Sequence, residues 1–254
     1  MNKVEFVLKI LSIDTASDIC GVSILEDNNL IINLDNNIGR THSENLMPMI
    51  QEAFNKSSFC LKDMDLISCD IGPGSFTGIR IGVATSKAFC DSLDIPCVGI
   101  SSLEVLAYNI KDIVNENEYI CSIIDCKNDN CYFALFEKKN GMFDTLIEPQ
   151  AESISNILAI LKSYCDDNFD GTTNDSNNIL ITFVGDGSKV YKNMIKETFS
   201  NGNFSDDNHN FLSSYSLGLA GLDKYNSEFT FAENEILPLY LKKPQAQRLL
   251  EEKK

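Results

Sequence analysis

The sequence has few of the residues that usually build metal or redox sites. Its 254 residues include two histidines, His42 and His209, and its nine cysteines include no Cys-x-x-Cys pair. A catalytic zinc ion needs about three protein ligands, often with two histidines on one helix. This count excludes a zinc peptidase and predicts no metal site. Cysteines in apolar runs are expected to be free and buried.

Basic residues and long apolar runs are also scarce. The chain has 21 Lys and Arg against 37 Asp and Glu, a formal net charge of -16. Binding nucleic acid alone requires clustered cations, so this balance argues against it. We find neither a signal peptide nor a membrane-spanning run, so we expect a cytoplasmic protein with no membrane partner. The last fifteen residues are basic, with five Lys or Arg against two Glu, which indicates a docking tail or a solvated helix end.

The most distinctive segment is Gly72-Pro73-Gly74-Ser75-Phe76-Thr77-Gly78. It follows a strand-like run, 66–71, and precedes a helix-like run, 79–93. Its spacing matches neither the Gly-Lys-Ser/Thr phosphate loop nor the Gly-x-Gly-x-x-Gly dinucleotide motif. Two interpretations stay open. The loop is either an anion-binding turn at a helix N-terminus or a tight turn that packs the helix onto a sheet.

A second segment predicts an amphipathic helix. Thr41 and Glu44 have the spacing of a capping box. An apolar stripe then recurs at helical spacing from Leu46 to Phe54. Pro48 lies within this stripe and predicts a kink or a later helix start. In the helix after the glycine loop, Gly82 with Ser86 and Ala84 with Ala88 form two pairs of small residues, which would let another backbone approach closely.

The remaining pattern predicts an α/β protein with two related halves. Strands are expected at 7–13, 20–25, 30–34, 96–100 and 179–184, with two more between 119 and 138. Helices are expected at 103–110, 154–161, 188–199 and 213–225, with polar loops at 166–178 and 201–210. We predict an N-terminal subdomain of residues 1–102 and a C-terminal subdomain of residues 103–235. The tail, 236–254, is expected to pack back on the first subdomain.

Several segments together resemble the TsaB (YeaZ) family, which takes part in bacterial synthesis of threonylcarbamoyladenosine (t6A) on tRNA. The resemblance implies an actin/Hsp70/sugar-kinase-like (ASKHA) fold with two related subdomains and a reduced second half. It keeps the family's order over nearly the whole length. The matching segments are 13–17, 42–50, 72–82, 98–103, 185–187 and 238–246.

The resemblance implies a non-catalytic subunit with no cofactor of its own. Such a subunit binds and activates the paralogous transferase TsaD, works with the ATPase TsaE, reaches tRNA through the complex and forms a homodimer when alone. The complex uses ATP. In the family the partner packs on the helices flanking the glycine loop. This implies interface positions at His42, Glu44, Leu46, Met47, Ile50, Phe54, Ile79, Gly82, Val83 and Ser86.

A stand-alone ATP-binding kinase or hydrolase of the same fold is the alternative. Its loops would be a vestigial or weak nucleotide site formed by Asp14, Gly72, Gly74, Ser75, Thr77, Gly78, Gly185 and Gly187. The turn Thr15-Ala16-Ser17-Asp18 argues against it, because the turn lacks glycine and Asp18 adds negative charge where a phosphate would sit. The chain also has Asp125-Cys126-Lys127 where the family usually has Asp-Ala-Arg, which puts any role of that arginine in doubt.

Overall fold

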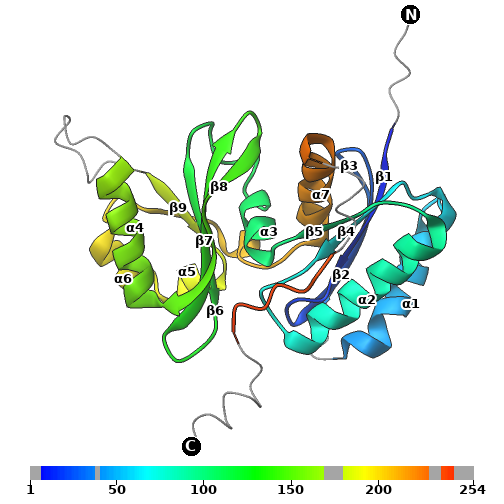
Figure 1. The fold of residues 1–254 in the computed structure, drawn as a ribbon, viewed down its shortest axis with the longest axis horizontal. Helices are drawn as coiled ribbons and strands as arrows, with labels where there is room; N and C mark the ends of the chain where they lie inside the picture. Colours follow the sequence, from blue (N-terminus) through cyan, green and yellow to red (C-terminus); the bar gives the residue numbers. More distant parts are fainter. Residues whose placement is uncertain (1–6, 38–40, 169–179, 229–235, 243–254) are drawn as a thin grey trace, which may run out of the picture. The chain divides into compact units, whose positions relative to one another are not determined.

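The computed structural model describes residues 7–37, 41–168, 180–228 and 236–242. The chain forms two compact units (Figure 1). The first comprises Met1–Tyr108 with Leu212–Lys254, and the second comprises Asn109–Phe211. The sequence predicts a boundary after residue 102 and places 103–235 in the second subdomain. The structure instead assigns α3 (Ser102–Tyr108) and α7 (Ser214–Glu228) to the first unit, because they pack on each other and α7 packs on the first sheet.

The first sheet has the strand order β3-β2-β1-β4-β5. The first three strands form an antiparallel meander, and β4 and β5 add to β1 in parallel. The inner strands are buried along nearly their whole length, which indicates cover on both faces. The strands are β1 (Lys9–Asp14), β2 (Ile19–Glu26), β3 (Asn29–Asn37), β4 (Leu66–Asp70) and β5 (Cys97–Ile100).

Opposite faces of this sheet carry different helices. Cys69 of β4 lies against Gly82 of α2 (Phe76–Leu93), whereas the hydroxyl of neighbouring Ser68 donates to the carbonyl of Leu217 in α7. Successive residues of a strand point to opposite faces, so α2 and α7 cover opposite faces. Also in this unit are α1 (His42–Lys56), which packs on β2, and the short 3₁₀ helix η1 (Leu61–Asp63).

Small residues bring α7 close to the sheet. A Cβ on Gly218 would lie 2.6 Å from Ser12 Oγ, and one on Gly221 would overlap the Ser68 side chain. The hydroxyl of Ser23 donates to the carbonyl of Ser214, at the start of α7. The helix and sheet therefore meet through glycines and serines.

The second sheet repeats the topology of the first. Read from β8, its order β8-β7-β6-β9-β10 matches β3-β2-β1-β4-β5, with an antiparallel meander followed by two parallel strands. This repetition is the arrangement expected of an ASKHA fold. The second unit consists of β6 (Tyr119–Asp125), β7 (Asn130–Lys139), β8 (Met142–Ser153), α4 (Ile154–Asn168), β9 (Ile181–Val184), α5 (Asp186–Val190), α6 (Lys192–Thr198), β10 (Asn203–Phe204) and η2 (Asp207–His209).

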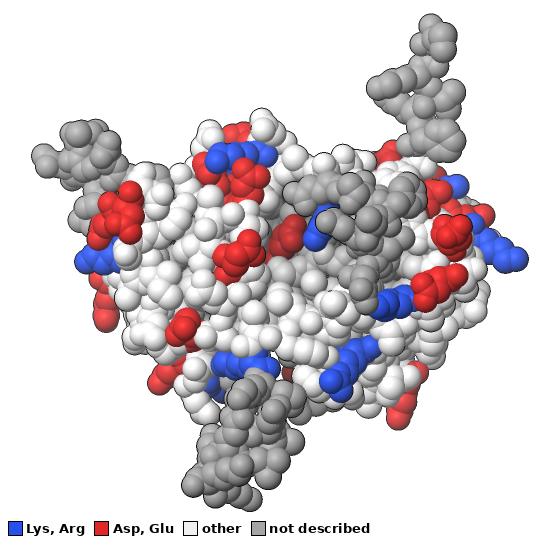
Figure 2. Space-filling model, viewed as in Figure 1, with Lys and Arg blue, Asp and Glu red and all other residues white. Residues whose placement is uncertain are grey.

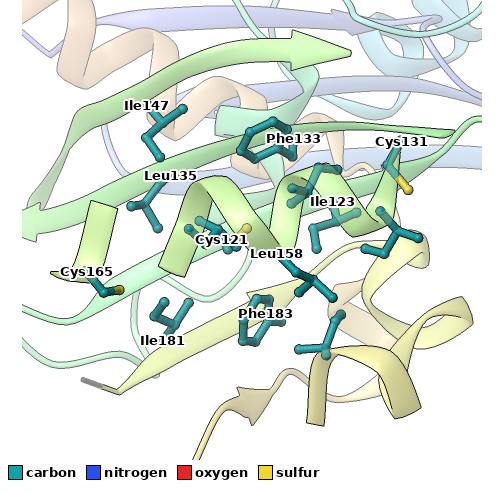
Figure 3. Packing of buried hydrophobic residues seen from close by; sticks show 14 residues of the cluster. Cys121, Ile123, Cys131, Phe133, Leu135, Ile147, Leu158, Cys165, Ile181 and Phe183 are labelled. Atoms are coloured by element: carbon teal, nitrogen blue, oxygen red, sulfur yellow. The ribbon is translucent and has the colours of Figure 1, made fainter. Parts of the chain in front are cut away.

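An apolar cluster fills the second unit. Leu158 of α4 and Phe183 of β9 point toward each other between the helix and the sheet (Figure 3). Three cysteines, Cys121, Cys131 and Cys165, belong to this cluster and are buried, as the sequence predicts. The sequence does not predict β8, a long strand that contains Pro149 and pairs with β7 through irregular register. Most of the predicted polar loop 166–178 lies outside the described residues.

Candidate functional site

The glycine loop and α2 form a groove that holds the turn between β1 and β2. Gly74, Gly78 and Gly82 recur four residues apart. A Cβ on Gly82 would lie 2.5 Å from Thr15 Oγ1, and Cβ atoms on Gly74 and Gly78 would overlap the backbone oxygens of Ala16 and Thr15. Gly74 and Gly78 therefore need to be glycine because a neighbouring backbone occupies the space of a side chain, whereas at Gly82 the side chain of Thr15 occupies it.

Hydrogen bonds fasten the turn in this groove. The Thr15 hydroxyl donates to the carbonyl of Gly78 at 2.7 Å, and the Ser75 amide donates to the carbonyl of Ala16 at 2.6 Å. Ser75 Oγ accepts from the amide of Gly78 and caps α2. The amides of Ser75 and Gly78 therefore already donate to oxygen atoms of this chain. Of the two interpretations left open by the sequence, the packing turn accounts for Gly74 and Gly78.

His42 fastens the same turn to α1. Its side chain is buried, and its Nε2 lies 2.8 Å from the carbonyl oxygen of Ser17, to which it donates. Its ring also packs near Gly78. The predicted capping box does not form, because the side chain of Thr41 makes no capping hydrogen bond. We call the turn 15–17, held by His42 and the three groove glycines, the loop clamp.

Two buried carboxyl groups lie at the strand ends that lead into the turn 15–17 and the glycine loop. Asp14 ends β1, and its Oδ1 accepts from the amide of Ala16 at 2.9 Å. Asp70 ends β4, and its Oδ1 accepts from the amide of Gly72 and the hydroxyl of Ser102, both at 2.7 Å. Gly72 itself has φ 101, a conformation that favours glycine. These carboxyls therefore shape the two loops from within.

The described part of the C-terminal segment, 236–242, packs on the first unit. Ile236 is buried, and the amide of Leu239 donates to the carbonyl of Ile71 at 2.7 Å. The ring of Tyr240 stacks on Phe76 with centroids 4.5 Å apart, and its hydroxyl accepts from Arg80 Nε at 2.8 Å. This part of the tail lies where the sequence predicts. Residues 243–254, most of the basic stretch, lie outside the described residues.

In the second unit, Gly185 and Gly187 lie at the start of α5, as the end of the glycine loop lies at the start of α2 in the first unit. Gly185 has φ 99, and its amide donates to Asn210 Oδ1 at 2.7 Å. A Cβ on Gly187 would lie 2.6 Å from Ile123 Cγ2. Asp186 accepts from the amide of Asp125, and burial raises the pKa of Asp186. The segment thus anchors α5 at the end of β6.

Comparison with known proteins identifies the family. The model of the family "TsaD: tRNA N6-adenosine threonylcarbamoyltransferase" matches residues 35–249. The chain is 28% identical over 197 residues to the tRNA threonylcarbamoyladenosine biosynthesis protein TsaB of Bacillus subtilis (strain 168), covering 78% of this chain and 79% of that protein. It is 26% identical over 240 residues to TsaB of Haemophilus influenzae, covering 92% and 94%. The chain belongs to the TsaD family and, within it, to the TsaB (YeaZ) proteins.

A solved structure has a similar fold. A protein from Pseudomonas aeruginosa, described as similar to the peptidase YEAZ, superposes with a TM-score of 0.70 at 21% identity, covering 92% of this chain and all of that chain. At this identity the likeness establishes the fold. Within the described ranges, no group of three or more His, Cys, Asp or Glu side chains is arranged to hold a metal ion. Nor does any helix in these ranges have the length and apolarity needed to cross a membrane.

The ten interface positions expected from the TsaB resemblance differ in their exposure within this chain. Seven of the ten expected positions are buried in this chain and face its own sheet and turn, because an amphipathic helix turns its apolar stripe inward. Glu44 and Met47 are exposed, Met47 by 52%, and Phe54 is half-buried. The seven buried positions are His42, Leu46, Ile50, Ile79, Gly82, Val83 and Ser86.

Other residues form the outward faces of the two helices. On α1 these include Pro48 and Gln51, and on α2 they include Arg80, Ala84 and Ala88. Once the apolar stripes are known to face inward, helical spacing identifies these residues as the ones on the opposite side of each helix. Of the expected nucleotide-loop residues, Thr77 is exposed and Ser75 half-exposed, whereas Asp14, Gly72 and Gly78 are buried.

Proposed function

We propose that this chain is a non-catalytic subunit in t6A synthesis on tRNA, which binds and activates the transferase TsaD and works with the ATPase TsaE. The names of its TsaB relatives support the pathway. The observation that carries the non-catalytic role is the loop clamp. Residues that could serve phosphate chemistry, such as Asp14 and Ser75, are engaged in holding a turn and a helix end.

The loop clamp also explains how a partner surface could be built. It joins the N-terminal ends of α1 and α2 to one turn, so these two helices are fixed next to each other. Their outward faces carry Met47, Ala84 and Ala88, an exposed methionine and two small residues four apart. Small residues allow another helix to approach, and methionine adapts to the opposing surface. A pair of partner helices could therefore pack on this face.

The charge of the chain fits a subunit that leaves most tRNA contact to others. On the face that Figure 2 shows, blue and red side chains are scattered, and the described residues form no broad basic patch. Phosphate binding would favour clustered Lys and Arg. The same outward face of α1 and α2 would also serve a homodimer when the partner is absent.

The test is to mix the full chain with its cognate TsaD and measure the complex by size-exclusion chromatography with light scattering. Ala84→Arg in α2 should weaken the complex, because a long charged side chain would separate the helices. Its matched control is Ala159→Arg in α4, also an exposed helical alanine. A threonylcarbamoylation assay of tRNA then shows whether activity needs both proteins.

Each outcome has a clear meaning. A complex that survives Ala159→Arg but not Ala84→Arg, with tRNA modification absent from either protein alone, supports the proposal. Equal binding of TsaD by both variants would show that the interface does not include the outward face of α2. No association, together with ATP turnover by this chain alone, would favour the stand-alone kinase or hydrolase.

A further inference from the structure

Asp14 and Asp70 are neighbours at the end of the first sheet. β1 and β4 are parallel, and Ile13 pairs with Cys69, so Asp14 and Asp70 follow as the next residues on each strand. Adjacent strands lie about 4.8 Å apart, and residues in register point to the same face. Both side chains are fully buried. Two carboxyl groups therefore share one buried location.

Each carboxyl group uses one oxygen and leaves the other without a partner. The Oδ1 atoms accept the hydrogen bonds that hold the two loops of the clamp. Within the described residues, Asp14 Oδ2 and Asp70 Oδ2 are both buried and make no hydrogen bond. A buried ionised carboxylate is costly unless donors or a cation compensate its charge. Ionising both of two neighbouring buried carboxyl groups costs further free energy, because their like charges repel.

The surroundings do not compensate this charge. Burial, and next the charge of Asp70, raise the pKa of Asp14 well above its usual range, and Asp35 on β3 adds to this rise. Burial raises the pKa of Asp70 to about 7, against hydrogen bonds from Ser102 and Gly72 that lower it. The nearby thiols, Cys20 on β2 and Cys69 on β4, also have raised pKa values. Among the described residues, no Lys or Arg on α2, α3 or α7 shifts either carboxyl.

We propose that Asp14 and Asp70 act as one acid pair that keeps at least one proton in the folded protein at neutral pH and makes the loop clamp sensitive to pH. One carboxyl holds the turn 15–17 through Ala16, and the other holds the start of the glycine loop through Gly72. Ionising both would place two like charges between the loops. The clamp, and with it the placement of α1 and α2, should then loosen.

The direction of the pH effect follows from linkage. The folded-state pKa values lie above that of an unfolded Asp, about 3.9. The stabilising contribution is therefore complete below that value and is lost as pH rises through the folded-state values, about 7 for Asp70 and raised for Asp14. For each proton that only the folded state retains, the unfolding equilibrium constant rises about tenfold per pH unit.

The experiment measures urea unfolding of the full chain between pH 5 and 9, for the unaltered protein, Asp14→Asn and Asp70→Asn. In each Asn variant the unfolding constant should rise less steeply with pH than in the unaltered protein. The rise per pH unit should be smaller by a factor of about ten, because one retained proton is lost. Asp91→Asn, at an exposed position of α2, is the matched control and should follow the unaltered protein. Parallel pH dependences for all four proteins would overturn the proposal.

A second measurement does not depend on the variants folding. In ¹³C NMR spectra of the unaltered chain, the Asp14 and Asp70 side-chain carboxyls should titrate together, with at least one above pH 7. Titration of both near the ordinary value of about 4 would overturn the proposal. So would a rise in the urea midpoint with Mg²⁺, absent with NaCl at matched ionic strength, because the pair would then hold a cation and not a proton.

Discussion

The two units repeat one topology around apolar cores, but the first unit adds polar contacts where its turn, loop and helix ends meet. In the first unit, turn, loop and helix ends meet through glycines, backbone hydrogen bonds and buried carboxyl groups. In the second, α4 and the sheet enclose an apolar cluster of aromatic and aliphatic side chains. The helices after the fourth strand differ accordingly. α2 has 18 residues, whereas α5 and α6 have 5 and 7.

This difference shows what three glycines at helical spacing contribute. They allow α2 to approach the first turn of the chain, so a long helix can begin there and continue along the sheet. The second unit has a close approach at Gly187, next to Ile123, and its helix ends within two turns. Both units therefore have an apolar core, and the first adds a polar clamp at the N-terminal end of its long helix.

The largest effect is expected when the apolar core of the second unit is cut. Phe183→Ala removes a fully buried ring that packs near Phe199 and Phe204. A cost of about 3–5 kcal/mol in unfolding free energy is expected from the lost burial and the remaining cavity. Hydrogen exchange read by mass spectrometry should show faster exchange across 109–211. Equal acceleration in both units would mean that they unfold as one cooperative body, and the comparison would then fail.

The loop clamp should be nearly as sensitive to a single methyl group. Gly78→Ala would place a Cβ on the carbonyl oxygen of Thr15, so backbone must shift. Overpacking of this kind costs about 1–3 kcal/mol, and a rigid backbone neighbour favours the upper end. Faster exchange should appear in the first unit, at residues 9–17 and 76–93.

A second glycine serves as its control. Gly141 lies in the turn between β7 and β8, with φ 76, and no atom outside its chain neighbours lies within 4 Å of the place where a Cβ would be. Gly141→Ala should cost about 1–2 kcal/mol, from its left-handed backbone conformation alone. If Gly78→Ala costs no more than Gly141→Ala in urea unfolding, the groove is not filled by the turn.

Much of this architecture follows from the sequence, and the exceptions have physical causes. Alternating and helical apolar patterns predict most strands and helices, because periodicity reflects burial. The pattern does not reveal that Leu46 and Ile50 face the chain's own sheet, since an inward stripe and a docking stripe look alike. It also misses β8, where Pro149 interrupts the alternation, and the pairing of α3 with α7, which depends on contacts between distant segments.

The site divides in the same way. The Gly-rich spacing predicts a special turn, but only the structure shows that the backbone of Thr15 and Ala16 fills the groove. The acidic residue Asp14 is visible in the sequence as a candidate. Asp70 is not, because its importance comes from lying beside Asp14 across two parallel strands that are 56 residues apart in sequence.

The smallest effect should come from the contact between the C-terminal segment and α2. Tyr240→Phe removes the hydrogen bond from Arg80 but keeps the ring that stacks on Phe76. Since this bond is exposed, a cost near the low end of about 0.5–1.5 kcal/mol is expected. Tyr240→Ala also loses the stacked pair and should cost about 0.5–1.5 kcal/mol more. Hydrogen exchange at residues 76–80 measures both effects. Equal effects of the two variants would show that the Tyr240 hydroxyl, and not its stacked ring, holds the C-terminal segment on α2.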